Sequence, residues 1–383
     1  MVSATALEPL WNRGLEWARR LQMIRVAREF LYLSTYYIEY DAYSIELIDA
    51  LAAAQRRGVQ VRLLIDGFGQ RLGGVLMSPP DKAALAARLA DLERAGADVG
   101  LYRPRRRLGR WLGGGHHVKI QVSEAGVAIF GSSNFTKQSF EGWNEYSVLV
   151  SGPIARTLLQ SYADLGCAVD PRHLERLGRE DACPPGSILF DYWMCDPNQH
   201  QGPFGPLGWP GPNVVTDRLV DMINQARQSI SITSFYFKPV DTLVDALVRA
   251  AGRGVRVEVH HSHLDALPAT ELAWIAAAAH YPRLLGAGVQ VFENRHGEHS
   301  KIILIDETWV AFGSYNFEHA AHDRLAEAML ASRDPRAIAP VLEILGELRA
   351  NPQNLQVSHG GLAAQSARLR FKRAALAPLK RWM

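Results

Sequence analysis

The sequence predicts an α/β protein made of two similar α/β/α sandwich domains, related by a pseudo-twofold axis and sharing one active site between them. Three observations predict this class: an internal repeat, strands that alternate with helices in both copies, and a polar motif that occurs once in each copy. The chain has 383 residues, which is long for a single core but ordinary for two domains. Its hydrophobic fraction of 48% and charged fraction of 21% are those of a globular protein.

The internal repeat is clearest where residues 47–61 read LIDALAAAQRRGVQV and residues 243–257 read LVDALVRAAGRGVRV. Each copy is typical of a helix that ends at a glycine and is followed by a β-branched strand. A strand candidate precedes each copy, and a second helix, an Ala-Gly turn and a further strand follow it. These flanking strands are predicted at residues 30–38, 99–102, 230–237 and 289–292. We therefore expect parallel α/β layers in each half.

The repeat divides the chain into four predicted parts. These are an N-terminal domain at residues 1–183, a connection at 184–212, a C-terminal domain at 213–350 and a basic tail at 351–383. The connection is rich in Pro and Gly, which favour turns and irregular chain.

Composition also predicts where the protein works. The net charge of +3 gives no global signature of nucleic-acid binding. Cys167, Cys183 and Cys195 are odd in number and lack paired spacing, which favours a reducing compartment. The N-terminus does not read as a signal peptide, and no apolar stretch approaches the ~18 residues of a membrane span. We expect a cytoplasmic protein that is soluble or peripherally bound to a membrane.

The polar motif is His-x-Lys followed, at identical spacing in both halves, by Gly-Ser-x-Asn and then by a glutamate. Its members are His117, Lys119, Gly131, Ser132, Asn134 and Glu145 in the first half, and His299, Lys301, Gly313, Ser314, Asn316 and Glu327 in the second. Residues two apart on a strand point to the same face, roughly 6.6 Å apart, so each His and Lys should project together. The glycine allows close backbone approach, and Ser and Asn supply neutral hydrogen-bond donors.

If the two halves face each other, both motifs converge on one site that suits a phosphodiester. The lysines and amides would neutralise the non-bridging oxygens as negative charge builds in the transition state. One neutral imidazole can attack phosphorus while the other, protonated, donates to the leaving oxygen. Glu145 and Glu327 are the carboxylates expected to orient the imidazoles. The residues alone leave open which histidine is the nucleophile.

A further carboxylate follows each histidine by seven positions: Glu124 in the first half and Asp306 in the second. The odd offset favours the opposite face of a continuing strand. We therefore predict that this carboxylate supports the turn and takes no part in the chemistry.

These residues resemble the phospholipase D superfamily, whose motif is His-x-Lys-x4-Asp followed by Gly-Ser-x-Asn. The second copy matches fully, the first departs only at Glu124, and the resemblance covers both halves. It implies the facing α/β/α fold, a covalent phosphohistidine intermediate, and neither metal nor cofactor. By the usual order of the superfamily, His117 would be the nucleophile and His299 the general acid and base.

Within the superfamily the chain is similar to bacterial cardiolipin synthases, particularly the forms without N-terminal membrane helices. The similar stretches are residues 61–69 (VRLLIDGFG), 103–105 (RPR) and 235–239 (FYFKP). This resemblance implies a phosphatidyltransferase that acts on an anionic phospholipid of the phosphatidylglycerol kind. Two alternatives use the same residues differently: a phosphodiesterase or nuclease that transfers to water, and a non-catalytic membrane-binding protein.

The first half carries ten extra residues before its histidine, and they are rich in arginine. Arg105, Arg106, Arg107 and Arg110 lie there beside Trp111, a mixture suited to the interface of an anionic membrane, here the inner face of the bacterial cell membrane. A solvated basic loop is the plain alternative, and nucleic-acid binding is less favoured because of the apolar tryptophan. The basic tail reads either as a second interfacial segment or as a solvated end.

Three histidines in a row of four, His260, His261 and His263, could suggest a metal site. No Asp, Glu or Cys with ligand spacing accompanies them. We expect them to line the substrate site or to be structural.

Overall fold

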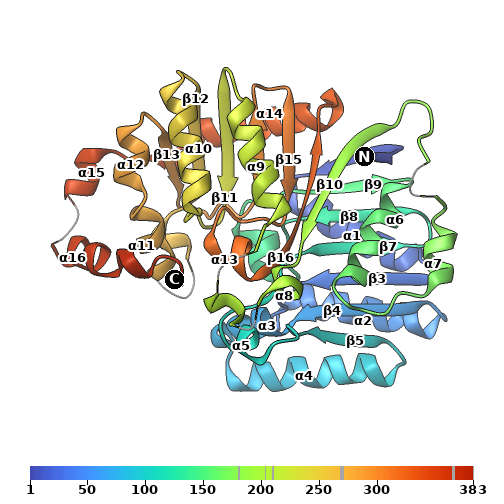
Figure 1. The fold of residues 1–383 in the computed structure, drawn as a ribbon. Coiled ribbons are helices and arrows are strands. Elements are labelled where there is room, and N and C mark those ends of the chain that lie inside the picture. Colours follow the sequence, from blue (N-terminus) through green and yellow to red (C-terminus); the bar gives the residue numbers. More distant parts are fainter. Residues whose placement is uncertain (180–181, 203, 209–210, 268–270, 365–366, 383) are drawn as a thin grey trace.

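The computed structural model describes residues 1–179, 182–202, 204–208, 211–267, 271–364 and 367–382. It contains two mixed β-sheets with helices packed against them (Figure 1). In this view the strands of the first sheet run across the page, and those of the second run up and down.

The first sheet has seven strands in the order β2-β9-β8-β7-β3-β4-β5. Their bounds are β2 Ala6–Leu10, β9 Ser147–Ser151, β8 Val127–Gly131, β7 Lys119–Ser123, β3 Phe30–Thr35, β4 Gln60–Asp66 and β5 Asp98–Tyr102. The pairs β3–β4 and β4–β5 are parallel, and the remaining pairs are antiparallel.

The second sheet repeats this order and extends it, as β1-β10-β16-β15-β14-β11-β12-β13-β17, with β6 paired to β16 off the path. Their bounds are β1 Val2–Ala4, β10 Ile188–Cys195, β16 Leu325–Ser332, β15 Trp309–Gly313, β14 Ile302–Ile305, β11 Ser229–Ser234, β12 Arg256–Ser262, β13 Gln290–Asn294, β17 Asn354–Gln356 and β6 Gly115–His116. The stretch from β10 to β13 corresponds strand for strand to that from β2 to β5. The predicted pseudo-twofold duplication is thus visible in the topology.

One part of the predicted connection at 184–212 is not irregular chain. Residues 188–195 form β10, which pairs antiparallel with β16 as β2 pairs with β9. Ile188 and Phe190 are buried while Leu189 and Asp191 are exposed, which is the alternation of a strand with one buried face. The Pro and Gly residues on both sides concealed this alternation. The division of the chain at 183 and 212 itself stays a prediction.

Helices complete each half. Those of the first half are α1 (Arg13–Val26), α2 (Ala42–Arg56), α3 (Gly67–Leu76), α4 (Pro79–Arg94), α5 (Arg107–Trp111), the π-helical turn η1 (Gln138–Gly142), α6 (Ile154–Asp164) and α7 (Pro171–Arg176). Those that follow are α8 (Pro197–His200), η2 (Gly205–Leu207), α9 (Val214–Gln225), α10 (Asp241–Gly252), η3 (Leu264–Ala266), α11 (Leu272–Ala278), α12 (Tyr281–Gly286), α13 (His319–Asp323), α14 (Pro335–Ala350), α15 (His359–Ala364), α16 (Ala367–Leu376) and η4 (Ala377–Leu379). The repeated segment forms α2 and β4 in one half and α10 and β12 in the other.

The two sheets bury a common core, which fixes how the halves face each other. Phe130 and Tyr146 of the first half pack with Phe312 and Phe190 of the second sheet, and the Tyr146 and Phe312 ring centroids are 5.2 Å apart. Helices α6 and α14 close this shared core. Separate cores lie under α1, α2 and α4 and under α9 to α12. None of the helices in the described part of the chain combines the length and apolar character that a membrane span requires.

The basic tail packs against the second half of the chain, where α15 and α16 form the red end of the ribbon in Figure 1. The ammonium of Lys380 pairs with Asp241 at 2.9 Å, and the guanidinium of Arg381 pairs with Asp323 at 2.8 Å. Lys372 also forms an ion pair, with Glu271. These pairs use much of the positive charge that a membrane-binding tail would need, which weakens the interpretation of this segment as an interfacial one.

Candidate active site

The two His-x-Lys motifs meet where the halves touch. His117 lies between β6 and β7, and its backbone N–H donates to Ala326 O at 2.7 Å. His299 precedes β14, and its backbone N–H donates to Asn144 O at 2.8 Å. Each histidine is therefore anchored to the residue just before the motif glutamate of the opposite half.

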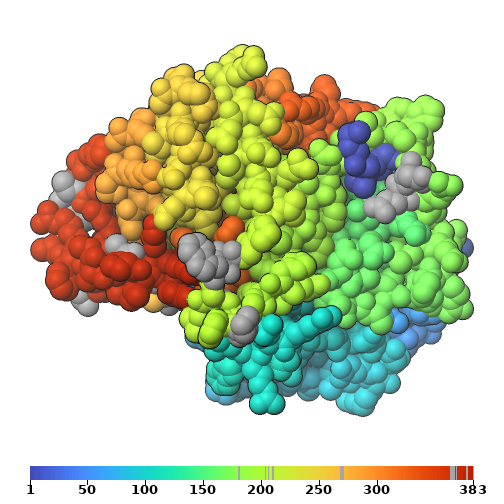
Figure 2. Space-filling view, in the orientation of Figure 1, coloured from blue at the N-terminus to red at the C-terminus, as the bar shows by residue number. Residues whose placement is uncertain are grey.

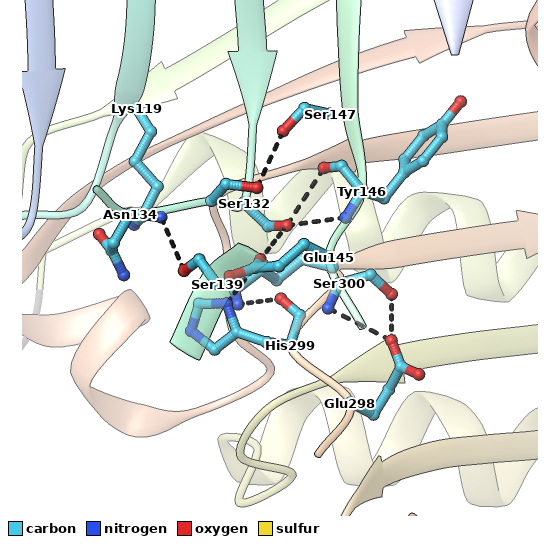
Figure 3. Close-up of polar contacts among 12 residues, drawn as sticks. Lys119, Ser132, Asn134, Ser139, Glu145, Tyr146, Ser147, Glu298, His299 and Ser300 are labelled. Atoms are coloured by element: carbon cyan, nitrogen blue, oxygen red, sulfur yellow. Dashed lines mark hydrogen bonds and ion pairs between the residues drawn. The ribbon is translucent and has the colours of Figure 1, made fainter. Parts of the chain in front are cut away.

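This anchoring pairs the histidines and glutamates crosswise. Nδ1 of His299 lies 2.8 Å from Oε2 of Glu145 (Figure 3), and Nδ1 of His117 lies 3.1 Å from Oε1 of Glu327 and 2.9 Å from Ser314 O. Carbonyl and carboxylate oxygens only accept, so each Nδ1 carries the hydrogen and each Nε2 keeps its lone pair. The sequence predicted that the glutamates orient imidazoles, but it did not predict that each serves the other half's histidine.

The motif serines support the glutamates. The Ser132 hydroxyl donates to Glu145, and the Ser314 hydroxyl donates to Glu327. Each serine oxygen also accepts a backbone N–H, from Tyr146 at 2.9 Å in the first case. A hydroxyl has one hydrogen to donate. The serines, predicted to be neutral hydrogen-bond donors in the site, therefore direct their hydrogens to the glutamates.

The motif lysines are fully enclosed and bend back to their own histidines. Nζ of Lys119 donates to His117 O at 2.8 Å, and Nζ of Lys301 donates to His299 O. An ammonium has three hydrogens, so two per lysine remain for a substrate anion. Burial lowers the pKa of Lys301 to about 8, against the opposing effect of carboxylates that include Glu145. Burial, together with the charge of Lys301, lowers the pKa of Lys119 well below its usual range.

Aromatic rings enclose the two imidazoles unequally. Trp143 stacks on His299 with ring centroids 5.0 Å apart, and Phe235 meets the same imidazole edge-on at 4.6 Å. His117 instead meets the edge of Tyr36 at 4.9 Å. The sequence motifs did not predict these rings. A signal was available for two of them, since Tyr36 and Phe235 directly follow the carboxyl ends of parallel strands, where α/β sites form.

The electrostatics of the two pairs also differ. Burial lowers the pKa of His299 to about 4, and burial with the lysine charges holds that of His117 well below its usual range. Burial would raise the pKa of Glu145, but His299 and its neighbours outweigh it and lower that pKa to about 2. At Glu327 burial prevails and raises the pKa well above its usual range. Without substrate both imidazoles are neutral near pH 7. Of the two glutamates, Glu145 beside His299 holds its negative charge more strongly than Glu327 does.

The comparison with known families agrees with this geometry. The family model described as "Cardiolipin synthase, PLD-like domain" matches residues 21–164 and 219–349, well over half of the chain and both motif copies. The chain belongs to this cardiolipin synthase family. It is therefore an enzyme, and the phospholipase D resemblance of its motifs is confirmed.

Sequence relatives and one solved structure show what this family member is similar to. It is 28% identical over 304 residues to cardiolipin synthase B of Escherichia coli K12, covering 76% of this chain and 68% of the relative. It is 27% identical over 331 residues to cardiolipin synthase B of Salmonella typhimurium, covering 82% and 73%. A crystal structure of phosphatidylserine synthase from Haemophilus influenzae superposes with a TM-score of 0.72 at 16% identity, covering 100% of this chain and 97% of the other. That likeness confirms the α/β fold.

In this member of the cardiolipin synthase family, the carboxylate seven residues after each motif histidine lies at the end of the strand that is far from the site. Oε1 of Glu124 accepts the backbone N–H of Arg28 at 2.7 Å. Oδ1 of Asp306 accepts those of Gln228 at 2.7 Å and Ser229 at 2.9 Å. Both carboxylates thus tie a hairpin turn to the chain that enters β3 or β11, which is the arrangement that the turn-supporting prediction requires.

Replacing Glu124 by Ala should therefore lower stability more than turnover. The variant leaves backbone N–H groups without their acceptor, so we expect a loss of about 1–2 kcal/mol in the free energy of unfolding. Urea unfolding and kcat would be measured on the same preparation, and kcat should change by less than about twofold. A large loss of kcat in a fully folded variant would contradict the prediction.

The pKa of Lys301 predicts how the family member's activity depends on pH. Its ammonium is charged below about pH 8 and loses its proton above it, which removes positive charge from the anion site. We expect kcat/KM, which reports the free enzyme, to fall roughly tenfold per pH unit above that value. A Lys301→Arg variant keeps its charge and should lack this decline. A wild-type profile that stays flat to roughly pH 9 would rule out this cause.

The three neighbouring histidines make ordinary structural contacts. His260 and His261 lie on β12, and His263 directly follows it. His261 hydrogen-bonds the Tyr281 hydroxyl at 2.6 Å, and His260 bonds Asn354 at 2.7 Å. His263 accepts the backbone N–H of Asp265 at 3.1 Å. In the described ranges no group of His, Cys, Asp and Glu is placed to hold a metal ion.

Proposed function

We propose that this enzyme transfers a phosphatidyl group between alcohols by a two-step phosphohistidine mechanism, as a cardiolipin synthase does. One observation carries the proposal: two enclosed imidazoles, each oriented by a glutamate of the other half, share a site with two lysines. The relatives named cardiolipin synthase B support a phosphatidyl donor and acceptor of the phosphatidylglycerol kind. The phosphatidylserine synthase, which shares the fold, bears the name of the same reaction class.

In the first step Nε2 of His117 attacks phosphorus. An N–P bond forms, the P–O bond to the headgroup alcohol breaks, and His299 gives its Nε2 proton to the leaving oxygen. The structure supports this division of roles. Nδ1 of His117 donates to the Ser314 carbonyl, which suits a neutral nucleophile, whereas the carboxylate of Glu145 favours a positive charge on His299. The negative charge of the bound phosphodiester would further favour protonation of that imidazole.

In the second step His299 removes the proton from an acceptor hydroxyl. The acceptor oxygen attacks phosphorus, the N–P bond breaks and His117 is released. A lipid hydroxyl gives cardiolipin, and water gives phosphatidic acid. Trp143 and Phe235 give His299 apolar surroundings, which disfavour water beside the base and support transfer over hydrolysis.

The arginine-rich insertion supports a membrane surface as the place of reaction. Arg105, Arg106 and Arg107 are exposed and 76% of the Trp111 side chain is exposed, while Arg110 is half-buried and donates to the chain of its own loop. Exposed arginines around an exposed tryptophan suit an anionic lipid interface. We propose peripheral binding at the inner face of the cell membrane.

Neighbouring elements extend this surface with apolar side chains. Val75 on α3 is 72% exposed and Phe204 before η2 is 70% exposed, and both elements contact α5. Figure 2 shows the chain around residue 105 adjoining the loop around residue 205 on one face. The opposite side of α3 packs against the site, because Gly69 leaves no room for a Cβ beside Tyr36. The proposed membrane face therefore adjoins the active site.

The test of function is incubation with vesicles of labelled phosphatidylglycerol, followed by lipid analysis. Cardiolipin as the main product supports the transferase, and phosphatidic acid alone would instead make the enzyme a hydrolase. Cleavage of single-stranded DNA with no lipid product would favour a nuclease.

Vesicle binding tests the membrane surface separately. The double variant Arg105→Ala/Arg107→Ala should bind phosphatidylglycerol vesicles roughly 30-fold more weakly, at about 1 kcal/mol per arginine near anionic lipid. The control Arg172→Ala/Arg176→Ala removes the same charge from α7, at the other end of the first sheet in Figure 1. Cosedimentation with anionic and neutral vesicles would compare them, and equal losses in both variants would refute this surface.

A further inference from the structure

The two motif asparagines, although equivalent in the repeat, leave opposite ends of their buried amides unpaired among the described residues. Asn134 is 1% exposed; its Oδ1 accepts from Tyr36 N at 3.3 Å, and its Nδ2 has no partner among the described residues. Asn316 is 2% exposed; its Nδ2 donates to Glu318 at 3.2 Å, and its Oδ1 has no such partner. One asparagine therefore offers a buried donor, and the other a buried acceptor.

The residue two positions later accounts for the orientation in the second half. It is Thr136 in the first half and Glu318 in the second. A carboxylate only accepts, so the amide beside Glu318 must turn its NH2 toward it. The second carboxylate oxygen pairs with the enclosed Lys238 at 3.0 Å, which fixes the carboxylate in place. In the first half the Tyr36 N–H, a fixed donor, turns the Asn134 oxygen away from the site instead.

The two unpaired amide atoms, Nδ2 of Asn134 and Oδ1 of Asn316, suit different ligand groups. An amide NH2 suits a non-bridging phosphate oxygen, whereas an amide oxygen would repel it and must face a hydrogen-bond donor. A phosphodiester anion has no hydrogen to donate, but the alcohol part of a polyol lipid has free hydroxyls. A buried acceptor left without a partner is unfavourable, so the site favours an alcohol that satisfies it.

We infer that Asn134 holds a phosphate oxygen while Asn316, turned by Glu318, binds a second hydroxyl of the alcohol and so selects polyols such as glycerol over simple alcohols and water. This deepens the proposed transferase and rests on it. Asn316 would touch the alcohol directly. Glu318 is a positioning residue, and Lys238 in turn fixes Glu318.

The variant Glu318→Gln should reverse the polarity of Asn316. Lys238 would hold the glutamine oxygen, so the glutamine NH2 would face Asn316 and turn the asparagine oxygen toward itself. Enzyme, phosphatidylglycerol vesicles and equal concentrations of deuterated glycerol and 1-propanol would be mixed in one tube. The ratio of deuterated phosphatidylglycerol to phosphatidylpropanol measures the preference, and it does not depend on how much of the variant folds.

We expect the wild type to prefer glycerol and Glu318→Gln to lower the ratio by about tenfold, the effect of one lost hydrogen bond. The matched variant Thr136→Val, at the equivalent position, should leave the ratio unchanged. If the wild type transfers but Glu318→Gln keeps the wild-type product ratio, this inference alone is wrong. The same conclusion follows if Thr136→Val lowers the ratio as much as Glu318→Gln does. A wild type that forms only phosphatidic acid overturns the proposed transferase as well.

Discussion

His117→Ala should abolish the phosphoenzyme and lower turnover of phosphatidylglycerol by roughly 10⁴- to 10⁶-fold, because the variant has no nucleophile at phosphorus. The covalent intermediate would be trapped with labelled lipid under denaturing, alkaline conditions, in which phosphohistidine survives. Wild-type enzyme should carry the label on His117, and the variant should carry none.

His299→Ala separates the two histidine roles. With phosphatidylglycerol it should form the intermediate roughly 10³-fold more slowly, because the leaving alkoxide lacks a proton donor. With a phosphatidyl nitrophenol, whose leaving group departs as a stable anion, intermediate formation should return toward the wild-type rate. If His299→Ala, and not His117→Ala, abolishes the label with both donors, the assignment of roles is reversed.

The crosswise pairing of histidine and glutamate predicts the second large effect. Glu327→Gln should slow formation of the phosphoenzyme roughly 10²-fold with either donor, because Glu327 contacts His117, the proposed nucleophile. Glu145→Gln should be equally slow with phosphatidylglycerol but largely restored with the nitrophenyl donor, because its partner is His299, the proposed proton donor.

Double variants distinguish this pairing from one within each half. Glu145→Gln should add little to His299→Ala, whereas Glu327→Gln should add its full effect to it. The opposite pattern would mean that each glutamate serves the histidine of its own half. Thermal unfolding of each variant is the control, since both carboxylates are buried and hydrogen-bonded to serines.

Much of the fold follows from the sequence because the repeat is local. The pattern shared by residues 47–61 and 243–257 predicted a helix and a strand in each half, and these are α2 with β4 and α10 with β12. The identical motif spacing predicted one shared site, and both histidines do meet there. Strand β10 was missed because its alternation of buried and exposed residues is short and lies between Pro- and Gly-rich stretches.

What the sequence could not predict are contacts across the boundary between the halves. Spacing gives no sign that Glu145 should pair with a histidine 154 positions later, nor that Trp143 should stack on the same ring. These contacts depend on how the shared core sets one sheet against the other. Within each half, spacing placed the serines in the site as neutral donors but gave no sign that their hydroxyls would donate to the motif glutamate of the same half.

The exchange of glutamates between the halves means that neither copy of the motif can serve as a spare. A change that shifts Glu145 impairs the second copy's histidine, and one that shifts Glu327 impairs the first, so selection acts on the two copies together. Two chains with complementary lesions, one at His117 and the other at His299, could rebuild one intact site only by trading entire halves. Recovery of activity on mixing such chains would therefore report domain swapping.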